Sequence, residues 1–299
     1  MKNEPGTRAT TGRFRDERSA GRFRAAYAEA LTLWPSPRRA LDIATDFGTT
    51  RVVHHGPDTG EPVVLLHGSD ANSSVWYPQV AAFAERHPVY AVDTVDDPGG
   101  SVQTAPVTGS ADAAAWLGQV VAGLALDRIH LVGHSYGGWL ALNQAAHAPD
   151  RLATVTVLDP GGLEKVRPAF YATVIGGALA TLLPRRARPW AARVLANSAV
   201  VADPRLTAPL MIAARSFGPR RTAARPFTDD ELRSIRVPLL VLLGARSTLM
   251  RVDRAQRRVR DLVAGAVAET VPATGHGLAM EKPEYVNARV LEFAETVRA

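Results

Sequence analysis

The sequence predicts an α/β protein with a mostly parallel, doubly wound sheet and an inserted helical cap. Short runs rich in Val, Leu and Ile alternate with helix-like segments along most of the 299-residue chain. Most of these runs are continuously apolar, which is typical of strands that helices cover on both faces. Residues 161–236 contain only helix-like segments, and they interrupt the alternation between two predicted central strands. This pattern indicates a layered α/β core with one insertion.

The predicted strands are apolar runs bounded by turn residues. They are 49–56, 62–68, 87–94, 128–134, 152–159 and 237–244. The first two flank the turn PDTGE, and a further strand-like run precedes His276. The predicted core helices between and after them are 76–87, 110–126, 137–149, 253–266 and 283–299.

The ends of the chain and the insertion complete the predicted domain organisation. Residues 20–35 resemble a helix that ends at Pro35, and residues 1–18 form a basic arm that we expect to be disordered. The predicted α/β core comprises 19–160 and 237–299, and the cap comprises 161–236.

Composition excludes several classes of protein. The chain is 46% hydrophobic and 21% charged, which is ordinary for a globular protein in water. No apolar run approaches the roughly 20 residues of a membrane span, and the N-terminus has no apolar signal region. We therefore expect a cytoplasmic protein without a membrane partner. The sequence has no cysteine, which excludes disulfides and thiolate chemistry.

The formal net charge is +6, and nearly all of the positive charge is arginine. Arginines concentrate in the N-terminal arm and in residues 184–225. One interpretation is attraction to an acidic ligand or partner; the other is a solvated face in an arginine-biased chain. No nucleic-acid-binding module accompanies the charge, so we expect no nucleic-acid partner. The sequence does not predict the oligomeric state.

The stretch GHSYGG, residues 133–138, places Ser135 between Gly133 and Gly137. It follows a predicted strand and opens a predicted helix, which is the setting of a nucleophile elbow. Small flanking residues let the strand and the helix approach each other at such a turn. The helix also points its N-terminus at the serine, which favours developing negative charge. Ser135 is therefore the candidate nucleophile.

An acyl-transfer serine needs donors for the oxyanion of the transition state. The backbone N–H of Tyr136, the residue after the nucleophile, is one candidate. The loop LLHGSDANSSVW, residues 65–76, supplies the second, and we expect it to be the N–H of Ser69. His67 in the same loop is expected to order the loop by hydrogen bonding rather than to act in catalysis.

The candidate general base is His276. It lies between two glycines, after a strand-like run and before the last predicted helix. The order Ser135 and then His276 matches the chain order of α/β-hydrolases. No metal-ligand cluster is visible, and the predicted chemistry requires no cofactor.

With these motifs, the chain resembles the α/β-hydrolase fold superfamily, and in particular small bacterial carboxylesterases with a helical cap. The segments that carry the resemblance include HGSDANSSVWYPQV, GHSYGGWLALN and GHGLAMEKPEYVNARVLEF, and it covers roughly residues 20–299. The resemblance implies a serine hydrolase that forms an acyl-enzyme. These signals specify the fold better than the substrate.

The acid of the triad departs from the superfamily pattern. The resemblance places the acid three residues after Gly244, where this chain has Ser247. A serine cannot hold an imidazolium as a carboxylate does. Three explanations remain open: the acid is Asp159, at the end of the strand after the elbow helix; it is Asp253, at the start of the next helix; or there is no acid and Ser135 and His276 act as a dyad.

The predicted function is hydrolysis of a small-molecule carboxylic ester by Ser135, His276 and Asp159, with the N–H groups of Ser69 and Tyr136 holding the oxyanion. Apolar cap residues such as Phe170 and Tyr171 are candidates to line the substrate pocket. A biosynthetic acyl transferase, thioesterase or cyclase with a modified triad is an alternative, and its substrate would carry an acidic group or a carrier. A non-catalytic scaffold that binds a ligand or a partner is a further alternative.

Overall fold

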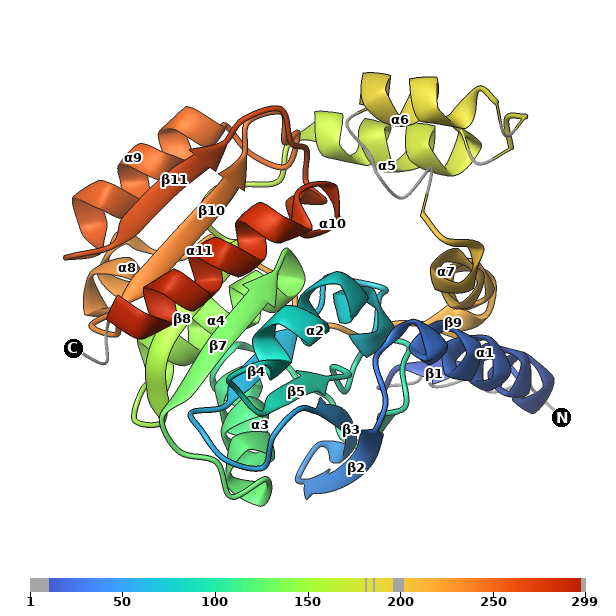
Figure 1. Cartoon of the computed structure of the whole chain (residues 1–299), viewed down its shortest axis with the longest axis horizontal. Helices are drawn as coiled ribbons and strands as arrows, with labels where there is room; N and C mark the ends of the chain where they lie inside the picture. Colours follow the sequence, from blue (N-terminus) through green and yellow to red (C-terminus); the bar gives the residue numbers. More distant parts are fainter. Residues whose placement is uncertain (1–10, 181, 185, 196–201, 297–299) are drawn as a thin grey trace, which may run out of the picture.

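The computed structural model describes residues 11–296 except 181, 185 and 196–201. Within these residues a nine-stranded sheet has the order β11-β10-β8-β7-β4-β5-β3-β2, and β6 pairs with β3 (Figure 1). The strands are β2 (Arg38–Thr45), β3 (Gly48–His55), β4 (Val63–Leu66), β5 (Val89–Val92), β6 (Val102–Gln103), β7 (Ile129–His134), β8 (Leu152–Leu158), β10 (Leu239–Gly244) and β11 (Val267–Val271). The pairs from β5 to β11 are parallel, whereas β2, β3 and β6 pair antiparallel.

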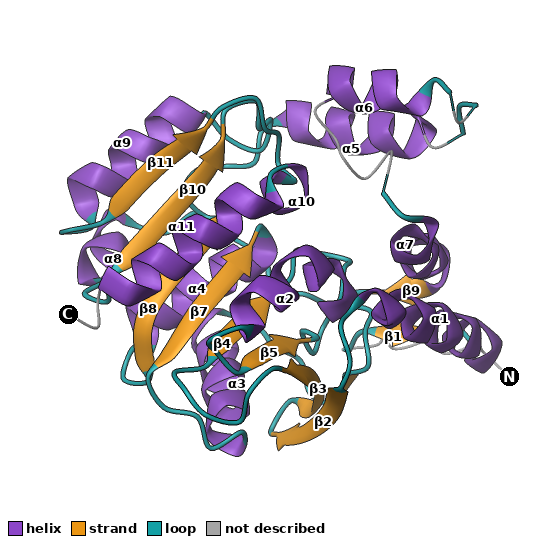
Figure 2. Ribbon diagram, in the orientation of Figure 1, coloured by secondary structure: helices purple, strands orange, loops and turns teal. Residues whose placement is uncertain are grey.

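Helices cover both faces of this sheet (Figure 2). They are α2 (Tyr77–Ala84), α3 (Ser110–Gly123), α4 (Tyr136–His147), α8 (Asp229–Ser234), α9 (Val252–Leu262), α10 (Leu278–Glu281) and α11 (Pro283–Thr296), with the 3₁₀ turn η2 (Ser73–Trp76) before α2. Val64 and Leu66 of β4 pack with α3, α4, α8 and α9 on one face. Val63 and Leu65 pack with α2, α10 and α11 on the other. Because successive side chains of a strand point to opposite faces, a two-sided core requires the continuous apolar runs seen in the sequence.

The six predicted strands correspond to β3, β4, β5, β7, β8 and β10, and the predicted mostly parallel α/β fold is confirmed. Strand β2, which pairs with β3 at the edge of the sheet, was not predicted from the sequence. Its sequence, RRALDIAT, mixes charged and apolar residues, and none of them is fully buried. An edge strand is covered less than a central one, so it lacks the apolar run that identified the others.

The inserted segment contains α5 (Pro168–Ala180), α6 (Arg188–Leu195), α7 (Pro204–Ser216) and the short strand β9 (Phe217–Gly218). It is therefore not purely helical. Further along, Leu232 of α8 and Ile235 are buried in the core cluster of the sheet, so α8 packs with the core. The division into core and cap otherwise stays a prediction.

The expected disorder of residues 1–18 is wrong for residues 11–18. Arg13–Phe14 form strand β1, which pairs antiparallel with β9, and Glu17–Ala30 form α1, followed by the 3₁₀ turn η1 (Leu31–Leu33). The Phe14 ring lies 4.9 Å from the Phe23 ring and 5.0 Å from the Phe217 ring. The free energy gained by packing these aromatic side chains exceeds the conformational entropy lost when this basic segment becomes ordered. Residues 1–10 lie outside the described residues.

Candidate active site

Ser135 lies at a sharp turn between β7 and α4, with φ 55° and ψ −112°. A Cβ atom on Gly133 would lie 2.2 Å from the Gly137 carbonyl oxygen, and one on Gly137 would lie 2.1 Å from the Leu66 carbonyl oxygen. Neither position accepts a side chain without moving backbone. The two glycines therefore let the helix start against the strands, which is the geometric requirement of a nucleophile elbow.

Asp159 follows β8, the strand that lies between β7 and β10, and its side chain is fully buried. His276 Nδ1 lies 2.6 Å from Asp159 Oδ2. A carboxylate accepts, so Nδ1 carries the hydrogen and Nε2 of a neutral His276 is left as an acceptor. The structure thus brings the candidate base together with Asp159, the first of the three candidates for the acid.

Ser247 occupies the position where the resemblance places the acid, and its hydroxyl donates to Asp159 Oδ2 at 2.5 Å. The backbone N–H of Gly244 donates to the other oxygen, Asp159 Oδ1, at 3.2 Å. The loop after β10 therefore supplies two donors to the Asp159 carboxylate.

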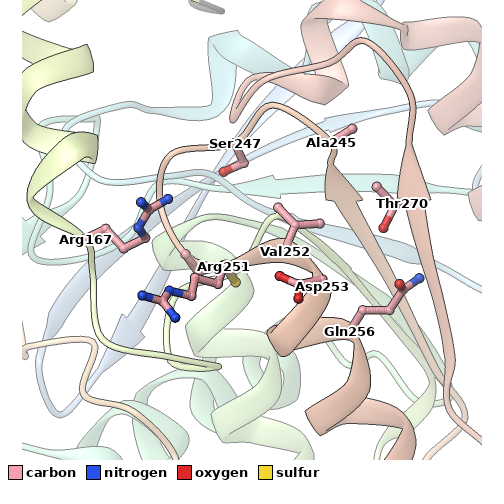
Figure 3. Close-up of a pocket in the computed structure, with 9 residues that line it drawn as sticks. Arg167, Ala245, Ser247, Arg251, Val252, Asp253, Gln256 and Thr270 are labelled. Carbon is pink, nitrogen blue, oxygen red and sulfur yellow. The ribbon is translucent and has the colours of Figure 1, made fainter.

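Asp253, the second candidate for the acid, forms an ion pair with Arg257 at 2.9 Å and is exposed. It lines a surface pocket of about 440 Å³ that also includes Arg167, Ser247 and Arg251 (Figure 3). In Figure 3 the Asp253 carboxylate lies on α9, away from Ser247. The hydrogen bonds of the described residues therefore connect His276 to Asp159 and leave Asp253 on the helix surface.

The residue before the nucleophile also approaches His276. His134 Nε2–H donates to the His276 carbonyl oxygen at 2.9 Å, and the two rings are 4.8 Å apart. Burial, with the neighbouring His276 as a smaller cause, lowers the pKa of His134 to about 4. His134 is thus neutral at physiological pH, and it links the turn at Ser135 to the loop of His276.

The loop after β4 lies directly against the nucleophile. A Cβ atom on Gly68 would come 3.2 Å from Ser135 Cβ. His67 is buried; its Nδ1 donates to the Gly68 carbonyl at 2.8 Å, and its Nε2 accepts from the Thr94 N–H at 3.1 Å. This is the ordering role expected for His67. Ser69 follows Gly68 in this loop, and Tyr136 is the first residue of α4, where a backbone N–H lacks an intrahelical partner.

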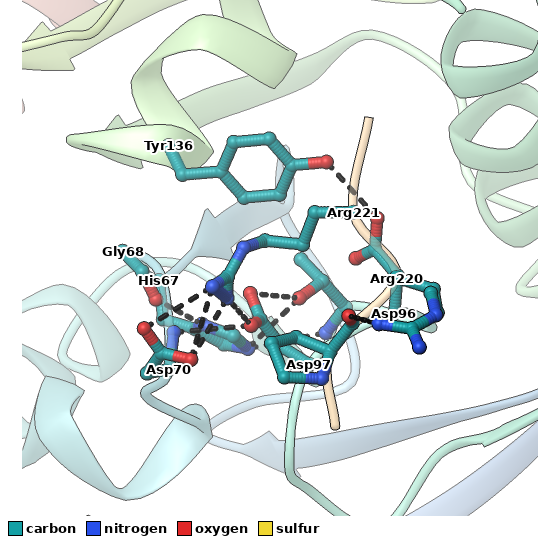
Figure 4. Close-up of polar contacts among 10 residues, drawn as sticks. His67, Gly68, Asp70, Asp96, Asp97, Tyr136, Arg220 and Arg221 are labelled. Carbon is teal, nitrogen blue, oxygen red and sulfur yellow. Dashed lines mark hydrogen bonds and ion pairs between the residues drawn. The ribbon is translucent and has the colours of Figure 1, made fainter. Parts of the chain in front are cut away.

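A group of charged residues beside this loop was not predicted from the sequence. Arg221, from the segment after β9, forms ion pairs with Asp70 at 3.0 Å and with the fully buried Asp97 (Figure 4). The Asp70 N–H donates to Asp97 Oδ1 at 3.0 Å, and the Tyr136 hydroxyl donates to Asp96 Oδ2 at 3.0 Å. Burial, and secondarily the charge of Asp97, raises the pKa of Asp96 to about 7. The arginine-rich stretch 184–225 was the available signal, but it did not indicate which arginine meets the core.

Within the described residues, no group of three or more His, Cys, Asp or Glu side chains could hold a metal ion. In the same part of the chain, every helix is too short or too polar to cross a membrane.

The sheet order and the turn at Ser135 define the class of protein. The chain belongs to the alpha/beta hydrolase family, whose model matches residues 63–289. It is 33% identical to carboxylesterase YbfK of Bacillus subtilis over 280 residues, covering 91% of this chain and 93% of that protein. It is 34% identical to the uncharacterized carboxylesterase nap of the same organism over 291 residues, covering 92% and 93%.

Solved structures of this kind superimpose on most of the chain. The crystal structure of carboxylesterase CesB (YbfK) from B. subtilis matches with a TM-score of 0.80 and 32% identity, covering 92% of this chain and 98% of that one. The naproxen esterase (carboxylesterase NP) from B. subtilis matches with a TM-score of 0.79 and 31% identity over the same shares. These relatives confirm the predicted resemblance and the predicted class, a carboxylic ester hydrolase.

Proposed function

We propose that this chain hydrolyses carboxylic esters through an acyl-enzyme on Ser135, with His276 as general base and Asp159 as the acid of the triad. The observation that carries the assignment is the 2.6 Å contact between His276 Nδ1 and the buried Asp159 carboxylate. This contact leaves His276 Nε2 free of a proton and able to take one from a serine hydroxyl.

In the first half of the reaction, Ser135 Oγ attacks the ester carbonyl carbon while its proton passes to His276 Nε2. The tetrahedral intermediate collapses when the bond to the alcohol oxygen breaks and the imidazolium gives its proton to that oxygen. In the second half, His276 takes a proton from water, and the resulting hydroxide equivalent attacks the acyl carbon. Collapse releases the carboxylic acid and returns the proton to Ser135.

The N–H groups of Ser69 and Tyr136 are proposed to hold the oxyanion. Support comes from the close approach of Gly68 to Ser135 and from the place of Tyr136 at the start of α4. Donors that are fixed before the reaction stabilise developing charge without reorganising.

Asp159 is proposed to orient His276 and to stabilise its positive form. A buried carboxylate is costly unless its oxygens are hydrogen-bonded. Gly244 and Ser247 each donate to the Asp159 side chain, which supports Asp159 as the acid of the triad.

The substrate is proposed to be a small-molecule ester with an apolar group near the cap. The Phe170 ring, at the start of α5, lies 5.0 Å from the His276 ring, so the cap reaches the general base. One relative of known structure is a naproxen esterase, which suggests an aromatic acyl group as a first substrate to test. A cytoplasmic location and an acidic group on the substrate stay predictions.

The test is the initial rate of p-nitrophenyl butyrate hydrolysis by the wild type and by Ser135→Ala, Asp159→Asn and Asp253→Asn. We expect the first two variants to lose activity by roughly a thousandfold or more. Asp253→Asn is the matched control, and it should retain the wild-type rate. If Asp253→Asn loses activity and Asp159→Asn does not, the acid assignment is wrong.

Labelling by a fluorophosphonate separates the alternatives. A wild type that is labelled in a Ser135-dependent way but hydrolyses no ester would favour acyl transfer over hydrolysis. A wild type that is neither labelled nor active would favour a non-catalytic scaffold.

A further inference from the structure

Helix α5 exposes a stripe of large apolar side chains. Tyr171, Ile175 and Leu179 recur at four-residue spacing and therefore share one face of the helix, and Leu182 follows just beyond its end. Their exposed fractions are 58%, 61%, 61% and 78%. Contiguous apolar patches on a soluble surface mark interaction sites more often than isolated apolar residues do.

The opposite side of α5 contacts the core. The Thr248 hydroxyl donates to the Thr173 hydroxyl at 3.1 Å, and Phe170 lies over His276. At about 100° per residue, Thr173 lies roughly opposite the centre of the stripe Tyr171–Ile175–Leu179. The stripe therefore points away from the loop after β10, which carries Ser247 and Thr248. It is not needed to hold the helix in place.

Helix α6 forms a helical hairpin with α5. It packs along α5, where a Cβ atom on Gly176 would lie 3.3 Å from Leu195, and the Arg193 carbonyl accepts from Arg246 of the core at 2.8 Å. Trp190 and Val194 of α6 are 66% and 56% exposed. Figure 1 shows α5 and α6 as a helical hairpin at the margin of the molecule, outside the layers of the sheet.

The charge of this region has a single sign. Between residues 165 and 202 the sequence has six basic residues and no Asp or Glu. The basic residues are Lys165, Arg167, Arg185, Arg186, Arg188 and Arg193. Helix α5 itself carries no charge, and the basic residues lie on α6 and in the segments before and after α5. An exposed apolar surface with basic residues beside it attracts anionic lipid headgroups.

We propose that the α5–α6 hairpin docks on the surface of an anionic lipid bilayer. Two copies of the hairpin would bring like charges together, which disfavours a second copy of this chain as the occupant. The apolar stripe lies on a projecting helix and not in a groove, so it suits insertion among lipid headgroups better than capture of a peptide. Docking without spanning is compatible with the helices of the described residues, each of which is too short or too polar to cross a membrane.

The proposal does not depend on the catalytic assignment. Phe170 lies 5.0 Å from the His276 ring, on the side of α5 that faces the core, so the stripe and the proposed active site lie on different sides of this helix.

The test is sedimentation of the full-length protein with vesicles of phosphatidylcholine alone and of phosphatidylcholine mixed with phosphatidylglycerol. We expect binding to the anionic vesicles, weaker binding to the neutral ones and a loss of binding as salt rises. Binding should shift the tryptophan emission to the blue, because Trp190 is exposed while the other four tryptophans are at most 3% exposed.

Two paired variants test the two parts of the surface. Ile175→Gln/Leu179→Gln removes apolar area and Arg186→Gln/Arg193→Gln removes charge, and each should lower the partition coefficient by about tenfold or more. The matched control is Val102→Gln/Val267→Gln, which changes two exposed valines on β6 and β11. This control should bind like the wild type, as should Ser135→Ala, which separates docking from catalysis.

Three results would overturn the proposal. The first is a wild type that does not bind anionic vesicles. The second is an equal loss of binding in the valine control and the hairpin variants. The third is a dimer in light scattering that Ile175→Gln/Leu179→Gln dissociates without any vesicle binding, which would make a second copy of this chain the occupant.

Discussion

Asp159 accepts three hydrogen bonds, and two of them converge on one oxygen. Both His276 Nδ1 and the Ser247 hydroxyl donate to Oδ2. The residue that stands where the resemblance places a carboxylate therefore supports the carboxylate of another strand. At the scale of single residues, the departure from the superfamily pattern is a change in which side chain donates and which accepts.

Removing the Ser247 hydroxyl should weaken catalysis without abolishing it. A hydrogen bond to a charged group contributes about 1.5–3 kcal/mol, and Ser247→Ala leaves Asp159 with its Gly244 and His276 partners. We expect kcat for p-nitrophenyl butyrate to fall by about 10- to 150-fold with little change in KM. Ser234→Ala, which removes a hydroxyl bonded to backbone on α8, is the control. An unchanged kcat in Ser247→Ala would show that the other donors suffice.

Asp96 gives a prediction for the pH dependence of stability. Its pKa is raised to about 7 in the folded state, so the folded chain holds a proton that the unfolded chain has lost above its ordinary pKa of 3.8. The free energy of unfolding therefore falls as pH rises from about 4 to 7. Asp96→Asn should remove a part of this fall, on the order of 3 kcal/mol. Urea unfolding of both proteins at pH 5 and pH 8 measures it, and equal pH dependence would contradict the assignment.

At the scale of elements, the segment after β9 is tied to the loop beside the nucleophile. Arg221 joins Asp70, which follows the proposed oxyanion donor Ser69, to Asp97 after β5. Asp70 itself has a left-handed backbone with φ 61°, an unfavourable conformation that the neighbouring contacts hold. The inserted segment thus helps to hold the loop beside Ser135 in place, in addition to covering the proposed active site.

Arg221→Met should affect both stability and catalysis. Loss of the guanidinium leaves the buried Asp97 carboxylate without its cation, which costs about 3–5 kcal/mol in comparable buried pairs. The freed Asp70 loop should lower kcat more than it raises KM, and Arg221→Lys should recover part of both losses. Arg233→Met, which breaks an exposed pair with Asp230, is the matched control and should change stability by less than about 1 kcal/mol. Equal effects of the two methionine variants in urea unfolding would contradict the role of Arg221.

At the scale of the whole molecule, the N-terminal segment connects the insertion to the core. Strand β1 pairs with β9, and Phe23 and Tyr27 of α1 form a buried cluster with Ala213 of α7. The Tyr27 hydroxyl then donates to the buried Asp93 after β5 at 2.9 Å. The first described residues therefore act as a brace between two parts that are distant along the chain.

Phe23→Ala tests this brace. The Phe23 side chain is fully buried, and truncation of such a phenylalanine costs about 3–5 kcal/mol when the surroundings do not collapse. We expect a lower free energy of unfolding in a single cooperative transition if the brace and the core unfold together. A second, earlier transition in circular dichroism would show that β1 and α1 unfold on their own. Phe14→Leu, a milder change at a half-buried position of the same cluster, should cost less.

The core of the fold was predictable because its signals are local. Continuous apolar runs identified β4, β7, β8 and β10, and glycines on both sides of Ser135 identified the turn that opens α4. The edge strand β2 and the strand β1 were missed because partial burial leaves no such run in their sequences.

The sequence by itself determined the strand-and-helix order, the turn at Ser135 and the loop of His276, since each depends on neighbours within a few residues. Only the tertiary structure decided that His276 meets Asp159, 117 residues away, and that Arg221 meets Asp97, 124 residues away. Ser247 shows why. The register between β8 and β10 decides which side chain reaches the base as its acid and which side chain only donates to that acid. Hydrophobic patterns do not determine this register precisely enough to place individual polar side chains.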